Sequence, residues 1–249
     1  MGNNKKLKKV PTRDGIGEIL TTKLPFIYTE AYKALRTNVE FLSATNNAKR
    51  IVVTSSLSGE GKTCLSINLA LLLAQTGKKV IILDCDLRKP KVHRYLRIKH
   101  SSQYGVSTVL GGTAELDSAI GYLDDLDLYV MLAGPTPPNP SELLNSDRTK
   151  EMFDKLSEKF DYIICDSAPA AIVTDAVALS QSCDGAIFVI RQNYASIDQI
   201  REAISRLEKV NTKIFGTVLN GYRASSDTSS YYSQYYYYYS NKHYADTDD

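Results

Sequence analysis

Six runs of apolar, largely β-branched residues alternate along this chain with segments of helical periodicity. The runs cover residues 50–56, 78–86, 127–134, 160–168, 184–192 and 213–221, and the helical patterns cover 62–75, about 147–159, 175–181 and 197–210. Most runs are apolar at successive positions, which is typical of strands buried on both faces. The alternation predicts an α/β fold: a doubly wound, mainly parallel sheet with helices on both faces and with ligands at the carboxyl ends of the strands.

A further helix is predicted before the first strand. Four apolar residues recur there at helical spacing: Ala31, Leu35, Val39 and Leu42. We expect this helix over about 29–45, with Thr29 as its N-cap. Residues 87–126 look irregular apart from two short helices.

The composition bounds the class of protein. A hydrophobic content of 43% and a charged content of 23% are ordinary for a globular protein, and a net charge of +2 gives no reason to expect nucleic acid as a partner. The four cysteines form no C-x-x-C pair, so we expect reduced thiols in a cytoplasmic protein. No apolar run approaches the roughly 18 residues that span a bilayer. We expect a flexible basic N-terminus over 1–25, one domain over 26–221 and a tyrosine-rich disordered tail over 222–249.

The segment "TSSLSGEGKTCLSINLA" joins the first strand to the first long helix. Backbone N–H groups of a glycine-rich turn and of a helix N-terminus together bind anions, and Lys62 would reach the β- and γ-phosphates of a nucleotide. The strict P-loop pattern has glycine where this chain has Ser56. An ordinary capped loop is the alternative. We expect a P-loop NTPase-type nucleotide site at Ser58, Gly59, Glu60, Gly61, Lys62, Thr63 and Cys64.

Acidic residues end two further strands. Asp84 and Asp86 lie on one side of the second strand by its period of two, and Asp166 ends the strand of residues 160–168. Three buried carboxylates would carry a heavy desolvation cost without a cation, and a magnesium–phosphate group supplies one. The alternative is that these residues are solvent-exposed N-caps of the helices that follow. That role would explain one acidic residue at a strand end, but it explains three poorly.

These motifs resemble those of a known family. "GEGKT", "ILDCDLRKP" and "YIICDSAP" resemble the deviant Walker A, A′ and B elements of the partition and septum-site ATPases and their relatives, although Leu57 replaces the lysine that these ATPases carry early in the loop. With "EAYKALRTN" upstream and a tyrosine cluster at the C-terminus, the chain resembles the bacterial tyrosine kinases (BY-kinases). More narrowly, it resembles the stand-alone cytoplasmic kinase subunits of capsule and exopolysaccharide systems in Gram-positive bacteria. The resemblance covers about residues 26–244.

The resemblance implies ATP and Mg²⁺ as cofactors and tyrosine as the phosphoryl acceptor. Lys62 would neutralise charge on the phosphates. Asp84 would take the proton of the tyrosine hydroxyl, whose ordinary pKa is about 10. Asp86 and Asp166 would hold Mg²⁺ together with the hydroxyl of Thr63. The division of roles between Asp84 and Asp86 stays open.

Asn220 and the basic turn after Asp86 each allow two interpretations. By resemblance, the side-chain amide of Asn220 would read adenine, and the alternative is a turn residue before Gly221. Arg88, Lys89 and Lys91 form a basic turn that either attracts acidic or phosphorylated tails or is merely solvated.

The C-terminal tail carries the acceptors that the resemblance implies, and the transfer would occur in trans. An adhesive low-complexity tail is the alternative. Each phosphorylation adds about −1.5 to −2 charges, so we hypothesise that unmodified tails hold a ring together and that modification disassembles it. The expected autophosphorylation sites are Tyr231, Tyr232, Tyr235, Tyr236, Tyr237, Tyr238, Tyr239 and Tyr244.

Glu30, Lys33 and Arg36 resemble the E-x2-R-x2-R assembly motif of the family, with lysine at the first arginine position. Lysine keeps the charge but loses the bidentate fork. The motif implies a homo-oligomer, with a ring as its expected form. The alternative is an intrahelical Glu30–Lys33 pair worth a few tenths of a kcal/mol.

The resemblance also implies partners and a function. The partners are a separate transmembrane activator of the polysaccharide co-polymerase type, which recruits the kinase to the inner face of the membrane, and other protein substrates. The expected function is an ATP-dependent protein-tyrosine autokinase that regulates capsular or exopolysaccharide polymerisation and export. A partition or septum-site type of switch ATPase, which hydrolyses ATP without phosphorylating protein, is the alternative, and Leu57 argues against it.

Overall fold

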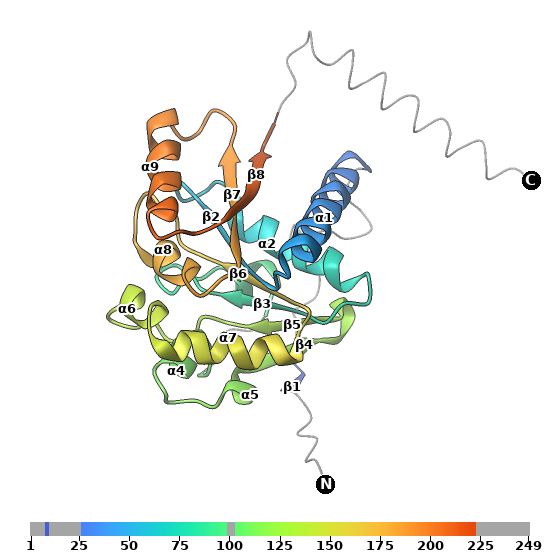
Figure 1. Cartoon of the computed structure of the whole chain (residues 1–249). Helices are drawn as coiled ribbons and strands as arrows, with labels where there is room; N and C mark the ends of the chain where they lie inside the picture. The colour runs from blue at the N-terminus through green and yellow to red at the C-terminus, as the bar shows by residue number, and fades with distance from the viewer. Residues whose placement is uncertain (1–7, 10–25, 99–102, 223–249) are drawn as a thin grey trace, which may run out of the picture.

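An eight-stranded sheet organises the chain, with strand order β1-β4-β5-β3-β6-β2-β7-β8 (Figure 1). The computed structural model describes residues 8–9, 26–98 and 103–222. The strands are β1 (Lys8–Lys9), β2 (Arg50–Ser55), β3 (Val80–Asp84), β4 (Ile120–Leu123), β5 (Leu128–Met131), β6 (Tyr162–Asp166), β7 (Gly185–Arg191) and β8 (Ile214–Asn220). The helices are α1 (Phe26–Asn46), α2 (Lys62–Ala74), α3 (Val92–Tyr95), α4 (Val106–Leu110), α5 (Leu116–Ala119), α6 (Pro140–Leu144), α7 (Asp147–Lys159), α8 (Asp175–Ser180) and α9 (Ile197–Glu208), with a 3-10 turn η1 at Asp124–Leu126.

The last six strands of this order, from β5 to β8, are parallel to one another, which confirms the expected fold class. All six predicted strands occur within their predicted ranges. Two strands were not predicted: β4 is antiparallel to β5, and β1 runs parallel to β4. Four residues interrupted by Gly121 are too short to show a strand pattern, and the two lysines of β1 carry no apolar residue at all.

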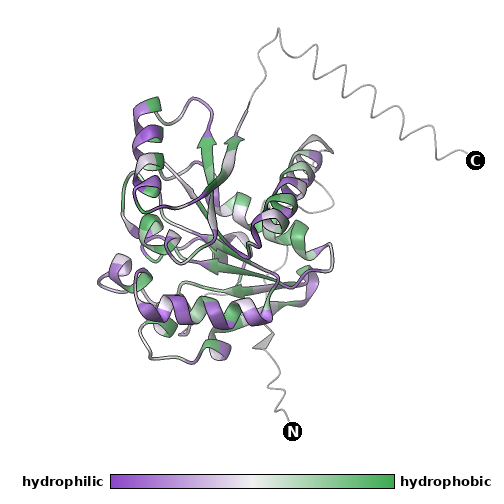
Figure 2. Cartoon of the chain, in the orientation of Figure 1, coloured by the Kyte–Doolittle hydropathy of each residue, from purple (hydrophilic) through white to green (hydrophobic). Residues whose placement is uncertain are grey.

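The continuous apolar runs arise because both faces of the sheet are covered. Ile51 and Val53 of β2 join one buried cluster with α1, α2 and α3, whereas Val52 joins a second cluster with α4, α7 and α8. A third cluster packs α9 against β7 through Phe188. Figure 2 shows hydrophobic strands inside and helices such as α7 that carry hydrophilic residues outward. Alternate residues of each strand therefore enter different cores.

Several predicted boundaries change. The helix α1 begins at Phe26, so the prediction of Thr29 as N-cap is wrong, and Thr29 lies inside the first turn. The two short helices expected within 87–126 are present as α3 and α4, but that segment also contains α5 and β4. The pairing of β1 differs at two residues from the flexible N-terminus expected over 1–25. The tail residues 223–249 lie outside the described residues.

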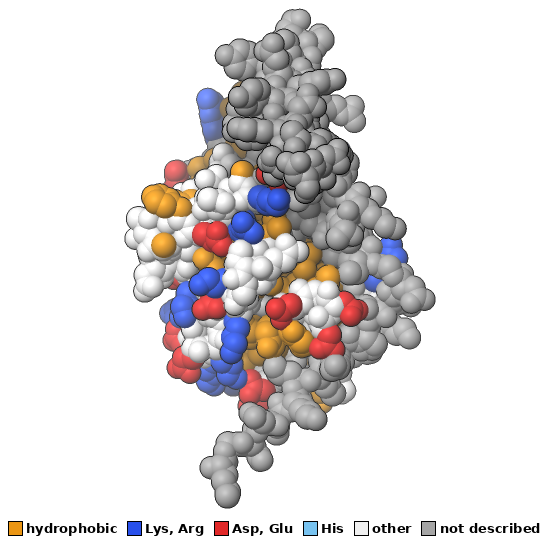
Figure 3. All heavy atoms as spheres, turned by 90° about the vertical axis from the view of Figure 1, so that its right-hand side faces the viewer, with side chains coloured by type: hydrophobic (Ala, Val, Ile, Leu, Met, Phe, Trp, Pro, Cys, Tyr) orange, Lys and Arg blue, Asp and Glu red, His pale blue; other side chains and the backbone are white. Residues whose placement is uncertain are grey.

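On the face shown in Figure 3, acidic and basic side chains of the described residues lie interspersed, so neither positive nor negative charge dominates it. None of the helices in residues 26–98 and 103–222 is both long and apolar enough to cross a membrane.

Candidate active site

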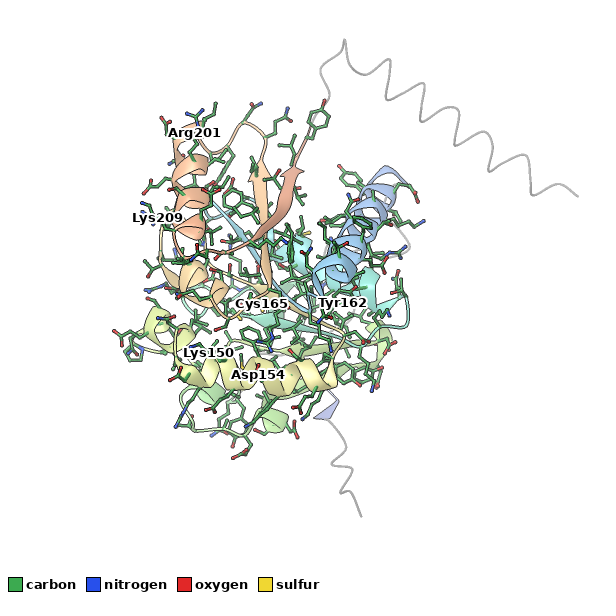
Figure 4. The ribbon with its side chains drawn as sticks, viewed as in Figure 1. Lys150, Asp154, Tyr162, Cys165, Arg201 and Lys209 are labelled. Carbon is green, nitrogen blue, oxygen red and sulfur yellow. The ribbon has the colours of Figure 1, made fainter. Side chains whose placement is uncertain are left out.

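Two carboxylates meet at the carboxyl ends of neighbouring strands. Asp84 at the end of β3 is in register with Asp166 at the end of β6, and the backbone N–H of Cys85 donates to the carbonyl of Asp166 at 2.8 Å. Paired residues of adjacent parallel strands project to the same face. Asp84 and Asp166 are 0% and 1% exposed. Cys165, which precedes Asp166, lies near the centre of the ribbon in Figure 4.

The helix α2 brings a cation and two hydroxyl groups to this pair. Lys62 begins the helix directly after Gly61 and is only 7% exposed. The hydroxyl of Thr63 hydrogen-bonds to Asp166. The hydroxyl of Ser66 donates to the carbonyl of Lys62 at 2.9 Å and lies 3.4 Å from Oδ1 of Asp166. Ser66 was missed by the sequence analysis, although its i+4 spacing from Lys62 places it on the same helix face.

Burial sets the electrostatics of this cluster. Desolvation raises the pKa of Asp84 well above its usual range, and the nearby Asp166 raises it further. Desolvation also raises the pKa of Asp166 to about 7, against the lowering effects of Thr63 and Lys62. The same burial lowers the pKa of Lys62, while the carboxylates of Asp166 and Asp86 raise it. The cluster therefore holds more acidic groups than Lys62 neutralises.

The pKa of Asp166 predicts how stability depends on pH in protein freed of metal and nucleotide. The folded state retains this proton up to a pH of about 7, whereas the ordinary pKa is 3.8. The unfolding free energy should therefore fall as pH rises through this window, by on the order of 2 kcal/mol between pH 5 and pH 7.5. Denaturant unfolding in EDTA at pH 5 and pH 7.5 measures the change. An Asp166→Asn variant should show a smaller change, and an equal change would contradict the assignment.

Asp84 and Asp86 occupy different environments. One oxygen of Asp84, Oδ2, accepts the backbone N–H of Val92 at 3.0 Å, and the other, Oδ1, is buried without a hydrogen-bond partner. Asp86 is half-buried and accepts the backbone N–H of Lys89 at 3.0 Å. Within residues 26–98 and 103–222, no group of three His, Cys, Asp or Glu side chains is placed to hold a metal by itself. The hard oxygen donors of Asp86, Asp166 and Thr63 fit Mg²⁺ only when phosphate oxygens complete the set.

The glycine-rich loop precedes α2 and has a backbone that only glycine adopts readily. Gly59 and Gly61 have φ values of +91° and +96°. The side chain of Glu60 is fully buried and turns back, so that it accepts the backbone N–H of Leu57 at 2.6 Å. The backbone N–H of Arg191 donates to the same carboxylate at 3.3 Å. The loop is therefore folded around an internal carboxylate that the sequence pattern did not reveal.

Asn220 lies against this loop. Its side-chain N–H donates to the carbonyl of Glu60 at 2.7 Å, and its Oδ1 accepts the N–H of Gly221 at 2.9 Å. One amide hydrogen remains for a nucleotide base. The residue therefore does more than end a strand.

Arg88 in the basic turn is engaged within the chain. Its guanidinium donates twice to Asp175, at 2.7 and 3.0 Å, and Asp175 is 0% exposed. Lys89 is exposed. The pair ties the segment after Asp86 to the start of α8.

Replacing Arg88 with methionine should destabilise the protein by about 2 kcal/mol, because it leaves the buried Asp175 carboxylate without its partner. Lys89→Met, which removes an exposed charge from the same turn, should change stability by no more than about 0.5 kcal/mol. Urea unfolding of the two variants makes the comparison. Equal effects would mean that the Arg88–Asp175 pair contributes nothing beyond surface charge.

The three residues of the predicted assembly motif lie on α1. Lys33 donates to Glu30 at 2.7 Å, which is the intrahelical pair of the alternative interpretation. Arg36 lies 3.8 Å from Glu40 one turn further on. All expected acceptor tyrosines, from Tyr231 to Tyr244, lie outside the described residues.

Comparisons with known proteins fit this geometry. A family model described as an AAA domain matches residues 48–218. Tyrosine-protein kinase YwqD of Bacillus subtilis (strain 168) is 35% identical over 207 residues, which cover 83% of this chain and 86% of the relative. The chain belongs to the bacterial tyrosine-protein kinases. The expected resemblance is confirmed.

Solved structures agree with this assignment. The kinase domain of Escherichia coli tyrosine kinase ETK matches this kinase with a TM-score of 0.74 at 32% identity, covering 83% of this chain and 84% of that one. The septum site-determining protein MinD of Pyrococcus horikoshii OT3, complexed with Mg-ADP, matches with a TM-score of 0.60 at 26% identity and 72% coverage of each chain. The switch ATPases thus share the fold, but the tyrosine kinases are more similar in sequence.

Proposed function

We propose that this kinase transfers the γ-phosphoryl group of ATP to tyrosines of its own C-terminal tail. The observation that carries the proposal is the buried Asp84–Asp166 pair beside Lys62, at the end of a glycine-rich loop, in a member of the tyrosine-kinase family. The tail supplies phenols: seven tyrosines lie between Ser229 and Ser240, and Tyr244 follows. A site for a triphosphate and a row of acceptors are thus encoded in one chain.

ATP and Mg²⁺ fit the residues present. The cluster contains more buried carboxyl groups than Lys62 balances. This excess of acidic groups suits a site completed by a cation. Asp86, Asp166 and Thr63 would hold the ion, and Ser58 to Cys64 would surround the phosphates. Bound Mg²⁺ would neutralise charge on the phosphate oxygens. The related MinD structure, with Mg-ADP, supports this choice.

We assign the roles of the chain's own groups as follows. Lys62 neutralises negative charge on the β- and γ-phosphates, since a phosphoryl transfer gains most from positioning and electrostatics. Asp84 Oδ1 takes the proton of the acceptor hydroxyl, and the pKa that burial raises makes its carboxylate a stronger base than an exposed one. This oxygen is buried in the described structure, so an incoming phenol requires a rearrangement that exposes it. The remaining amide hydrogen of Asn220 reads adenine.

We further propose the biological setting that the family suggests. The kinase would regulate capsular or exopolysaccharide polymerisation and export from the cytoplasm, at the membrane, through a separate transmembrane activator. It would form a ring through Glu30, Lys33 and Arg36 on α1. The Lys33–Glu30 pair must open if either side chain is to bind a neighbouring subunit, so we expect a weaker contact than two arginines would give.

A mixing experiment tests transfer in trans. The full chain carrying Lys62→Met has intact acceptors, and a second chain with Phe at all eight expected tail tyrosines has an intact site. The two chains are mixed with Mg-ATP and with a peptide of the cytoplasmic segment of the activator (the activator peptide). Phosphotyrosine should then appear on the Lys62→Met chain. Phosphate release without phosphotyrosine on either chain would instead support the switch ATPase.

A further inference from the structure

Three consecutive carbonyl groups of the glycine-rich loop are held by side chains from a distant part of the sequence. The hydroxyl of Tyr194 donates to the carbonyl of Ser58 at 2.9 Å, and a guanidinium N–H of Arg191 donates to that of Gly59 at 3.1 Å. Asn220 donates to the next one, that of Glu60, at 2.7 Å. These three donors, which we call the carbonyl clamp, come from the end of β7, the segment that follows it, and the end of β8.

The clamp lies so close to the loop that side chains are excluded from it. A Cβ atom on Gly59 would lie 2.9 Å from the hydroxyl oxygen of Tyr194, and one on Gly61 would overlap the side-chain nitrogen of Asn220. The glycines therefore serve two needs at once. They permit the positive φ angles, and they admit the donors that hold the carbonyls.

Holding these carbonyls has a consequence for the opposite side of the loop. Anion-binding loops work because successive backbone N–H groups converge on the ligand. A loop whose carbonyls are fixed by the clamp loses less conformational entropy when the anion binds. The buried Glu60 carboxylate, bonded to Leu57 and Arg191, fixes the same loop from within.

We propose that Tyr194 is a positioning residue for nucleotide binding, which holds the glycine-rich loop in its phosphate-binding form through the Ser58 carbonyl. This inference rests on the proposed nucleotide role of the loop and adds a residue to it. The guanidinium carbon of Arg191 lies over the aromatic ring of Tyr194, 5.0 Å from the ring centroid. This cation–π contact orients both clamp donors. The ring is 47% exposed, so little of the fold depends on it.

Tyr194→Phe provides the test, because it keeps the ring and removes only the hydroxyl. Dissociation constants for ADP and for inorganic tripolyphosphate should both rise about 3- to 10-fold, the effect of losing one hydrogen bond. The phosphorylation rate at saturating ATP and the melting temperature should stay close to those of the parent. Tyr122→Phe is the matched control. It also removes one hydroxyl, which donates to Asp127 at 2.6 Å, but Tyr122 lies on β4, which four strands separate from β7 in the sheet.

The outcomes separate the inference from the proposed function. Unchanged affinity of Tyr194→Phe for both probes would overturn the inference, as would a loss confined to ADP, which indicates a contact with the base. A lowered melting temperature with unchanged affinity would show a merely structural role. If the parent chain itself binds neither probe, the proposed nucleotide site fails.

Discussion

Replacing Lys62 with methionine should reduce tyrosine phosphorylation by at least about 100-fold at saturating Mg-ATP. Lys62 is the buried cation of the site and faces Asp166, Asp86 and Glu60. Methionine fills a similar volume but cannot neutralise the charge that develops on the transferred group. Quantitative mass spectrometry of phosphotyrosine over time measures the rate.

The matched control for this variant is Lys155→Met, which removes one exposed lysine from α7. It should phosphorylate at the parent rate. A Lys62→Met chain that keeps more than about a tenth of the parent rate would contradict the central electrostatic role of this lysine.

Replacing Asp84 with asparagine should have opposite effects on activity and on stability. The phosphorylation rate should fall about 100- to 10,000-fold, because the amide cannot accept the proton of the acceptor hydroxyl. In EDTA and without nucleotide, however, the variant should unfold at a higher denaturant concentration at pH 7.5. Burial raises the pKa of Asp84, so the folded state is penalised when this carboxylate ionises. Active-site residues often reduce stability in this way.

The variant Asp86→Asn, compared with Asp84→Asn, distinguishes the roles of these two neighbouring carboxylates. If Asp86 holds Mg²⁺ and Asp84 acts as base, Asp86→Asn raises the Mg²⁺ concentration needed for half-maximal rate, and Asp84→Asn leaves that concentration nearly unchanged. Titration of Mg²⁺ at fixed ATP gives both values. The reverse pattern would exchange the two assignments.

Much of the fold follows from local patterns. Residues 51–53 and 162–165 are apolar at successive positions because alternate residues enter different cores, so both the strands and the parallel sheet could be predicted. Asp84 and Asp166 could be expected together because carboxyl ends of parallel strands share one edge. The strand β4 could not be predicted, since four residues interrupted by Gly121 are too short a segment to show a strand pattern.

The residues that hold the glycine-rich loop in place could not be predicted from the sequence. Tyr194 and Arg191 lie more than 130 positions after the loop that they contact. No spacing rule links residues so far apart, and an exposed tyrosine in a connecting segment gives no pattern. The buried Glu60 reads as an ordinary charged loop residue until its bonds to Leu57 and Arg191 are known. Motifs thus indicate candidate ligand-binding groups, while the groups that orient them emerge only from the fold.

The central claim is that the loop and strand-end acids deliver the terminal phosphoryl group to the tyrosines of the tail. The most direct test follows ADP formation and phosphotyrosine content in one reaction of the purified chain with Mg-ATP and activator peptide, with phosphosites mapped at each time. We predict that early ADP and phosphotyrosine rise together and that the modified sites fall between Tyr231 and Tyr244. ADP formation with every tail tyrosine unmodified would contradict the account and favour a hydrolytic switch.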